Sequence, residues 1–287
     1  SEQSDLNIAL SGMHGDAPHL VLAPLDIADC VFTTGWAVQL AQHLHTAAIV
    51  LSDQFIGQST AVVSEPRRCQ LDLPGPAAVD GDYLRYRLTD SGVSTLAAPG
   101  DIEQRFTADG LEHDERGTPS ARQSDHLQQL EKRRRKLDDF DYGDDWAQCS
   151  GAGPLALVSF GSSSAAVAGA AAMLAEQGIE ARCIALRLLA PLQTDALRDA
   201  LAGSDNVLVI EQNHAGQLFR YLRGQMDFSQ PVHSYAVPGP VPLSAEAIAQ
   251  QAMEVLNKGP RQSSSRRRIT SPASNRSGAP VAGIFPC

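Results

Sequence analysis

Leu155-Ala-Leu-Val-Ser-Phe160-Gly-Ser-Ser-Ser164 is a mostly apolar run that stops at a glycine and three serines. A short apolar run of this kind fits a strand that is buried on both faces, as in a parallel sheet. The serines fit the start of a helix, which the sequence predicts for residues 165–177, and Gly178 fits its end. A strand that leads straight into a helix is the repeating unit of α/β folds.

The same alternation continues almost to residue 257. Three further strands are predicted at 181–186, 207–211 and 232–236, and three further helices at 194–201, 216–225 and 244–256. Strands and helices that alternate at this spacing indicate an open parallel sheet covered by helices. We therefore expect residues 151–257 to form a complete α/β domain that folds by itself.

The first 60 residues contain one similar unit. Residues 20–23 and 47–51 fit buried strands, and Asp26 can cap the helix predicted between them. One such unit is not a domain, because a parallel sheet needs further strands and helices to cover both of its faces. We therefore expect residues 1–60 to be the final part of a domain that continues upstream of Ser1.

The middle and the end of the chain are irregular. Residues 61–150 are rich in charge, proline and glycine, with one turn and strand predicted at 83–87 and one helix at 124–137. So little periodicity indicates an extended connecting arm that lies on a partner or a neighbouring domain. Residues 258–287 form a basic, low-complexity tail that we expect to be disordered.

The charge and the cysteines exclude several classes of protein. The chain has 23 basic and 33 acidic residues, and six of the basic residues follow Asn257, so residues 1–257 carry a formal charge of −16. Nucleic acid is therefore not an expected partner. The five cysteines form no C-x-x-C pair, which predicts neither a zinc site nor an iron–sulfur cluster. No run is apolar enough to span a membrane, and we expect a cytoplasmic protein with reduced thiols.

Two loops carry groups that could bind or react. The loop 161–164 could hold a phosphate at a helix start, but it lacks the lysine of a P-loop, and helix capping is the favoured interpretation. The loop 12–18 contains His14, which could transfer protons near neutral pH, and Asp16. The alternative is that Asp16 simply caps and turns this loop.

Charged residues near the middle of the chain form another candidate. Four charged or titratable residues follow one another at 112–115, so they cannot all face one metal ion on a helix or strand, and a turn held by buried ion pairs is favoured. The basic run 132–136 is either a solvated helix face or a contact with another subunit. The candidate partner contacts in this region are Glu112, His113, Asp114, Glu115, Arg133 and Arg134.

Polar residues follow the third strand predicted between residues 155 and 236. Gln212, Asn213 and Gln217 lie just beyond the end of that strand. Loops at the carboxyl ends of parallel strands are where open α/β sheets bind ligands or partners. The three side chains are therefore candidate partner contacts, and the alternative is that Asn213 and Gln217 satisfy backbone groups at a helix start.

Three strings, in this order and spacing, resemble a known family: Ile49-Val-Leu-Ser-Asp-Gln54, Leu111-Glu-His-Asp-Glu115 with the basic run after it, and Ile210-Glu-Gln-Asn-His-Ala-Gly-Gln-Leu218. The family is the alpha subunit of the 2-oxoacid:ferredoxin oxidoreductases, most closely the 2-oxoglutarate type. The resemblance covers residues 1–257 and implies an α/β fold in three parts. Residues 1–60 would end a thiamine-enzyme pyrimidine-side domain, 61–150 would be an arm, and 151–257 would resemble the transketolase C-terminal domain.

The resemblance also implies an activity, the oxidative decarboxylation of a 2-oxoacid such as 2-oxoglutarate to an acyl-CoA, with electrons passed to ferredoxin. In this family thiamine diphosphate with Mg²⁺ and a 4Fe-4S cluster are held by a beta subunit, and coenzyme A is a co-substrate. The family's Tyr-Pro-Ile-Thr-Pro and Gly-Pro-Ser-Thr-Gly motifs do not occur here. We therefore expect an incomplete subunit that holds no metal and is inactive alone, with His14 near the thiamine site. The alternative is a non-catalytic assembly module that binds a thiamine-enzyme partner.

Overall fold

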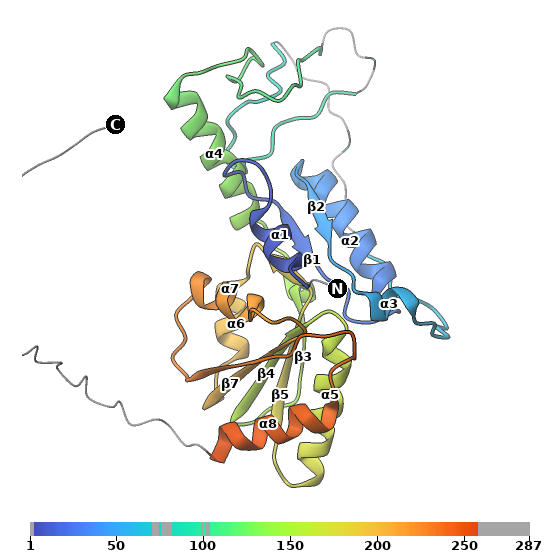
Figure 1. Ribbon diagram of the computed structural model, residues 1–287. Helices are drawn as coiled ribbons and strands as arrows, with labels where there is room; N and C mark the ends of the chain where they lie inside the picture. The colour runs from blue at the N-terminus through green and yellow to red at the C-terminus, as the bar shows by residue number, and fades with distance from the viewer. Residues whose placement is uncertain (1–2, 71–74, 76–81, 99, 101–103, 258–287) are drawn as a thin grey trace, which may run out of the picture.

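The computed structural model describes residues 3–70, 75, 82–98, 100 and 104–257. They form two β-sheets (Figure 1). Residues of both sheets belong to one hydrophobic core. The tail predicted for residues 258–287 lies outside the described residues. Among the helices that the structure describes, none combines the length and the apolar character needed to cross a membrane.

The larger sheet has the strand order β3-β5-β4-β7-β8. Its strands are β3 (Ala147–Ser150), β4 (Leu155–Phe160), β5 (Ala181–Leu186), β7 (Asn206–Glu211) and β8 (Val232–Ala236). The pairs β4–β5, β4–β7 and β7–β8 are parallel, which confirms the predicted parallel sheet. Strand β3 was not predicted, and it pairs antiparallel with β5.

Side chains of alternate residues of β4 point to opposite faces of this sheet. Leu155 and Leu157 pack with α5 (Ser163–Glu176) and α8 (Ala245–Asn257) on one face. Ala156 and Val158 face the other way, into the core that the two sheets share. That core also includes residues of α6 (Thr194–Ala200) and α7 (Gln217–Gln225). Burial on both faces explains why β4 is apolar along its whole length.

The smaller sheet has the order β2-β1-β6. Strand β1 (Leu20–Leu22) runs parallel to β2 (Ala48–Val50), and α2 (Asp29–Leu44) connects them as expected for a βαβ unit. The third strand, β6 (Leu188–Ala190), comes from the second half of the chain and pairs antiparallel with β1. Short helices α1 (Asp5–Ser11) and α3 (Gln54–Gln58), which the sequence did not predict, complete this half.

The arm differs from the prediction at two points. Residues 83–87 form a turn without a strand, because Tyr86 bonds across to Glu115 rather than into a sheet ladder. Residues 147–150, predicted to end the arm, are strand β3 of the larger sheet. The predicted helix is present as α4 (Gln123–Asp138), and the one-turn 3-10 helix η1 (Gly143–Trp146) leads from it into β3.

Candidate functional site

The strand order of the larger sheet creates a crevice between β4 and β7. The chain passes from β4 to β5 on one side and later to β7 on the other, so the loops after β4 and β7 diverge. Open α/β sheets bind ligands or partners at this switch point. Gly161 follows β4 and Gln212 follows β7, so both polar loops selected from the sequence reach the crevice.

The N-terminus of α5 is already bonded to a carboxylate from the first half of the chain. The backbone N–H of Ser162 donates to Oδ2 of Asp53 at 3.1 Å. A carboxylate is favoured there by the free N–H groups and by the helix dipole. Helix capping by the serines was the favoured interpretation, but Ser162 at the helix start makes no side-chain cap, and the Asp53 carboxylate bonds to its backbone N–H instead.

Glu211 and Asn213 organise the start of α7. Glu211 is fully buried, and its Oε2 accepts hydrogen bonds from the backbone N–H of Leu218 at 2.7 Å and from Nδ2 of Asn213 at 2.6 Å. Oδ1 of Asn213 accepts from the backbone N–H of Gly216 at 2.8 Å. The interpretation of Asn213 as a residue that satisfies backbone groups at a helix start is confirmed.

Gln217 connects the crevice to the first half of the chain. Its Oε1 accepts from the backbone N–H of Asn7 at 3.0 Å, and its Nε2 donates to the carbonyl of Gln3 at 2.5 Å. Gln212 donates to the carbonyls of Gly239 and Val241, both at 2.8 Å. These contacts leave a cavity of about 120 Å³ in the crevice. The crevice therefore seats residues of the first half, and a contact of Gln212, Asn213 or Gln217 with another subunit stays a prediction.

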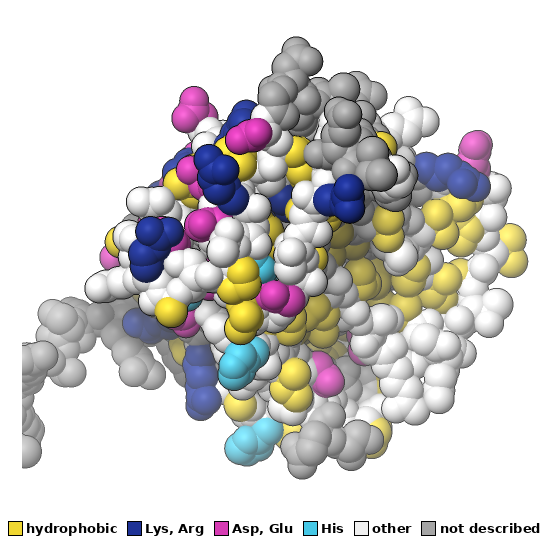
Figure 2. All heavy atoms as spheres, turned by 90° about the horizontal axis from the view of Figure 1, so that it is seen from above, with side chains coloured by type: hydrophobic (Ala, Val, Ile, Leu, Met, Phe, Trp, Pro, Cys, Tyr) yellow, Lys and Arg dark blue, Asp and Glu magenta, His cyan; other side chains and the backbone are white. Residues whose placement is uncertain are grey.

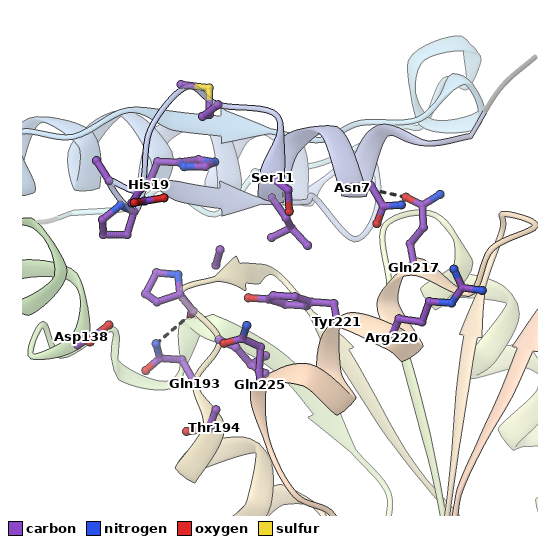
Figure 3. Close-up of a pocket in the computed structure, with 18 of the residues that line it drawn as sticks. Asn7, Ser11, His19, Asp138, Gln193, Thr194, Gln217, Arg220, Tyr221 and Gln225 are labelled. Atoms are coloured by element: carbon purple, nitrogen blue, oxygen red, sulfur yellow. Dashed lines mark hydrogen bonds between the residues drawn. The ribbon is translucent and has the colours of Figure 1, made fainter. Parts of the chain in front are cut away.

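A cavity of about 870 Å³ lies beside Gln217, between α1 with the loop after it and the segment from β6 through α6 and α7 (Figure 3). Both halves of the chain supply polar groups to it. The polar lining residues are Asn7, Ser11, Asp16, His19, Asp138, Gln193, Thr194, Asp195, Gln217, Arg220, Tyr221 and Gln225.

Two of the three aspartates that line this cavity are paired with arginines. Asp138 bonds to Arg134 at 2.6 Å, and Asp195 to Arg198 at 2.5 Å. Arg220 is the one Lys or Arg side chain among its lining residues. The Tyr221 hydroxyl donates to the Leu189 carbonyl at 2.7 Å, and burial raises its pKa to about 12, so it stays protonated. Besides Asp16 and Arg220, the cavity therefore offers a polar molecule mainly neutral hydrogen-bonding groups.

The structure separates the two candidates of the loop 12–18. Asp16 lines the cavity, whereas His14 is exposed and is not among the lining residues. Three residues that the sequence reasoning missed are Asn7, Arg220 and Tyr221, which lie on helices α1 and α7. They belong to no motif, so only the packing of the two halves reveals them.

The cluster at 112–115 is a turn held by ion pairs, as expected. Both carboxylate oxygens of Glu112 contact the Arg133 guanidinium, at 2.5 and 3.1 Å, and Nδ1 of His126 lies 2.8 Å from Oε2. Burial raises the pKa of Glu112, but the hydrogen bonds from Arg133 and His126 outweigh it and hold that pKa below its ordinary value. His113 is buried with its ring stacked on Tyr86, at 4.6 Å between centroids.

Most side chains of the basic run 132–136 form hydrogen bonds that hold other segments of the chain against α4. Nζ of Lys132 donates to the Ser94 hydroxyl at 2.5 Å, and Nζ of Lys136 donates to the His45 carbonyl at 2.7 Å. Burial, together with neighbouring cations, lowers the pKa of both lysines to about 8. Arg134 is the more solvated member and bonds to Glu131 and Asp138. A subunit contact through Arg133 or Arg134 stays a prediction.

The described residues hold no preformed set of ligands for the metal ion that accompanies thiamine diphosphate. Nowhere among them do three His, Cys, Asp or Glu side chains gather as a metal site. The N-terminus of α5, where N–H groups could take a diphosphate, is bonded to Asp53. We therefore derive no step of a reaction through this cofactor on these residues.

Comparisons with known proteins identify both halves. Residues 1–132 match the family described as pyruvate flavodoxin/ferredoxin oxidoreductase, thiamine diphosphate-binding, and residues 150–258 match the transketolase C-terminal domain. Subunit alpha of 2-oxoacid:ferredoxin oxidoreductase 2 from Aeropyrum pernix is 30% identical over 83% of this chain. The chain is a relative of the alpha subunits of 2-oxoacid:ferredoxin oxidoreductases. This confirms the resemblance and the fold class inferred from the three strings.

Two further relatives support the assignment. The 2-oxoglutarate synthase subunit KorA of Methanothermobacter marburgensis is 29% identical over 76% of this chain. A structure of 2-oxoglutarate:ferredoxin oxidoreductase from Magnetococcus marinus, with 2-oxoglutarate, coenzyme A and succinyl-CoA bound, superposes with a TM-score of 0.78 at 30% identity over 88% of this chain. The chain spans only 40% of the Aeropyrum subunit, 59% of the Methanothermobacter subunit and 45% of the solved chain.

Proposed function

We propose that this chain forms part of the alpha subunit of a thiamine-diphosphate-dependent 2-oxoacid:ferredoxin oxidoreductase. The complete enzyme would convert a 2-oxoacid, with 2-oxoglutarate the favoured substrate, to an acyl-CoA and pass the electrons to ferredoxin. The observation that carries the proposal is the succession of the two matched domains in one chain, together with the superposition on the Magnetococcus enzyme. We place the enzyme in the cytoplasm.

In this enzyme the cofactors would be held by polypeptides other than this chain. Among the described residues no three His, Cys, Asp or Glu side chains gather as a metal site, and the Ser162 N–H at the start of α5 is bonded to Asp53. Thiamine diphosphate with Mg²⁺ and the 4Fe-4S cluster would therefore be held by a beta subunit, and coenzyme A would be a co-substrate of the complex. This chain would contribute the loop 12–18 and the surfaces around it.

The loop 12–18 is the proposed point of contact with the thiamine site. His14 is exposed at its tip, and Asp16 faces the large cavity. An exposed imidazole can exchange protons once a second subunit encloses it. His113, in contrast, is buried against Tyr86 inside the arm. Glu112, Asp114, Glu115 and Arg133 hold that arm, which supports a structural role for the whole cluster.

A non-catalytic assembly module is the second candidate. It is favoured by the structural roles of Gln217, Glu112 and Asp53, which bond to other segments of this chain. An experiment distinguishes the two. A beta subunit of the 2-oxoglutarate synthase type is co-expressed with a form of this chain extended to the full length of its relatives, and viologen reduction is measured with 2-oxoglutarate and coenzyme A. A stable complex that reduces the dye supports the enzyme, and a stable but inert complex supports the assembly module.

A further inference from the structure

The cavity beside Gln217 lies where the two halves of the chain meet. Its volume of about 870 Å³ falls in the range of pockets that bind small molecules, about 300–1,000 Å³. One wall comes from α1 and the loop 12–18, and the other from the segment β6 to α7 (Figure 3). Pockets for small molecules occur preferentially at such boundaries between domains. A molecule bound here would contact both halves at once.

Two charged side chains that line this cavity have no partner. Asp16 in the loop 12–18 and Arg220 on α7 form no ion pair or side-chain hydrogen bond with any described residue, including one another. The other two lining aspartates differ, because Asp138 contacts Arg134 and Asp195 contacts Arg198. The cavity therefore offers one available cation and one available carboxylate.

Paired charges are common elsewhere on the surface. Figure 2 shows basic and acidic side chains intermixed over the face seen from above, where α4 and the arm lie in Figure 1. There Arg133 contacts Glu112, and Arg134 contacts Glu131. The chain has 33 acidic and 23 basic residues, so carboxylates outnumber the cations that could pair with them. An arginine that contacts no carboxylate in such a chain is available to an anionic group of a ligand.

Neutral polar groups and apolar side chains complete the lining. The side-chain amides of Asn7 and Gln225 have no hydrogen-bond partner among the described residues, and each amide can both donate and accept. Leu10 and Leu192 supply apolar surface. An inorganic ion would leave these amides and this apolar surface unused. The lining therefore fits an organic molecule that carries neutral amide groups as well as charge.

The two available charges are separated along the cavity. Figure 3 shows Arg220 beside Gln217 at one end, and His19 toward the opposite end. Asp16 lies three residues before His19 in the chain, and it forms no ion pair with Arg220. In a free amino acid the ammonium and carboxylate groups are joined through one carbon. The lining therefore favours a molecule whose two charges lie further apart than those of a single amino acid.

We propose that this cavity binds an elongated zwitterion of the size of a short peptide, with its carboxylate on Arg220 and its ammonium group on Asp16. The amides of Asn7 and Gln225 bond to the neutral peptide groups between the two ends. The bound molecule holds the loop 12–18 against α7. This inference goes beyond the proposed function and does not depend on it, because the binding needs neither a cofactor nor a second subunit.

Calorimetry on the purified full chain tests the proposal, with glycine and with di-, tri- and tetraglycine as probes. Each added glycine moves the two charges of the probe apart by about 3.5 Å. The tightest-binding peptide should have a dissociation constant of about 1 mM or lower, and glycine should bind at least about tenfold more weakly. The same peptide should raise the midpoint of thermal unfolding, because a ligand that binds only the folded chain stabilises it.

Blocked peptides and two substitutions identify the contacts. Arg220→Gln should weaken binding of the tightest-binding peptide at least about tenfold and make that peptide and its C-terminal amide bind equally. Asp16→Asn should do the same for that peptide and its N-acetyl form. Arg223→Gln and Asp227→Asn, at exposed positions outside the lining, are the matched controls and should change nothing. Thermal melting of each variant without peptide verifies folding.

Three results would overturn the proposal. The first is the absence of saturable heat with every peptide up to about 10 mM. The second is an equal affinity of the unchanged chain for a peptide and its two blocked forms. The third is an affinity that Arg220→Gln and Asp16→Asn leave unchanged. None of these results bears on viologen reduction by the complete enzyme, so the proposed function would stand.

Discussion

Arg187 and Asp29 form a bidentate ion pair between residues 158 positions apart, with Nε 3.0 and 3.1 Å from the two carboxylate oxygens and a terminal nitrogen 2.9 Å from Oδ1. Their side chains are 7% and 13% exposed. Arg187 also donates to the Asp145 carbonyl at 2.7 Å. The pair therefore joins the start of α2 to the turn between β5 and β6, and ties the two sheets together.

Breaking this pair should destabilise the whole chain. Arg187→Met leaves the Asp29 carboxylate buried without its partner, which costs about 3–5 kcal/mol for a buried pair. We expect the loss in urea unfolding, followed by the fluorescence of Trp36 in the first half and Trp146 beside β3. Arg198→Met, which breaks a more exposed pair with Asp195, should change little. Equal effects of the two substitutions would show that the Arg187 pair does not join the halves.

The resistance of the arm to local opening should depend on Glu112. Glu112→Gln keeps the shape of the side chain but removes the charge that holds Arg133 and His126, so the segment 104–122 should open more often. Limited proteolysis should cut this segment several-fold faster, whereas Glu131→Gln, on the solvated side of α4, should leave the rate unchanged. Because the pKa of Glu112 is depressed, its contribution is present above the unfolded-state pKa and is lost as the pH falls through the folded-state pKa. A cleavage rate that Glu112→Gln does not change would show that the contacts of Glu112 with Arg133 and His126 do not hold this segment in place.

The buried lysines Lys132 and Lys136 should change how the stability of the chain depends on alkaline pH. Their pKa values are lowered from 10.5 to about 8 in the folded chain. Between these values each of the two lysines binds more protons in the unfolded chain, so its contribution to the free energy of unfolding rises with pH, against the opposite contribution of the buried cysteines and tyrosines, whose pKa values are raised. Lys132→Met should flatten this rise in urea unfolding measured from about pH 8 to about pH 10. Arg134→Gln is the control. An unchanged slope in Lys132→Met would show that Lys132 titrates normally.

The fold could be predicted where burial is local. Residues 155–160 and 207–211 are buried on both faces of the sheet, so their apolar runs indicate strands without any knowledge of neighbours. Strand β6 could not be separated from β5, because a single residue, Arg187, divides them. That residue turns the chain by bonding to Asp29, and the sequence does not reveal such a distant partner. Strand β3 was missed because three of its four residues are exposed and not strongly apolar.

The site could be predicted only in part, for the same reason. The capping role of Asn213 follows from its position three residues before Gly216. The bond between Gln217 and Asn7 joins residues 210 positions apart, and nothing in either local sequence indicates it. Asp53 at the start of α5 is a similar case. The cavity between the halves exists only because of such contacts, so Arg220 and Tyr221 were out of reach of sequence reasoning.

The second half should unfold cooperatively on its own, and β3 should add to its stability. Residues 152–258 contain the four parallel strands and their helices, whereas residues 145–258 also include β3, which pairs with β5 at four positions. We expect a single urea transition for both segments, with the free energy of unfolding about 1–2 kcal/mol higher for the longer one. A segment 152–258 without a cooperative transition would reject the division of the chain at this point.

We have proposed that this chain is part of the alpha subunit of a 2-oxoacid:ferredoxin oxidoreductase and acts only together with other polypeptides. The most direct measurement is 2-oxoglutarate-dependent viologen reduction by the purified chain alone and by the completed alpha subunit in complex with a beta subunit. We expect no reduction and no saturable thiamine diphosphate binding by the chain alone. We also expect coenzyme A-dependent reduction by the complex, which His14→Ala lowers at least about tenfold and His113→Ala lowers less. Dye reduction or saturable thiamine diphosphate binding by the chain alone would contradict the claim.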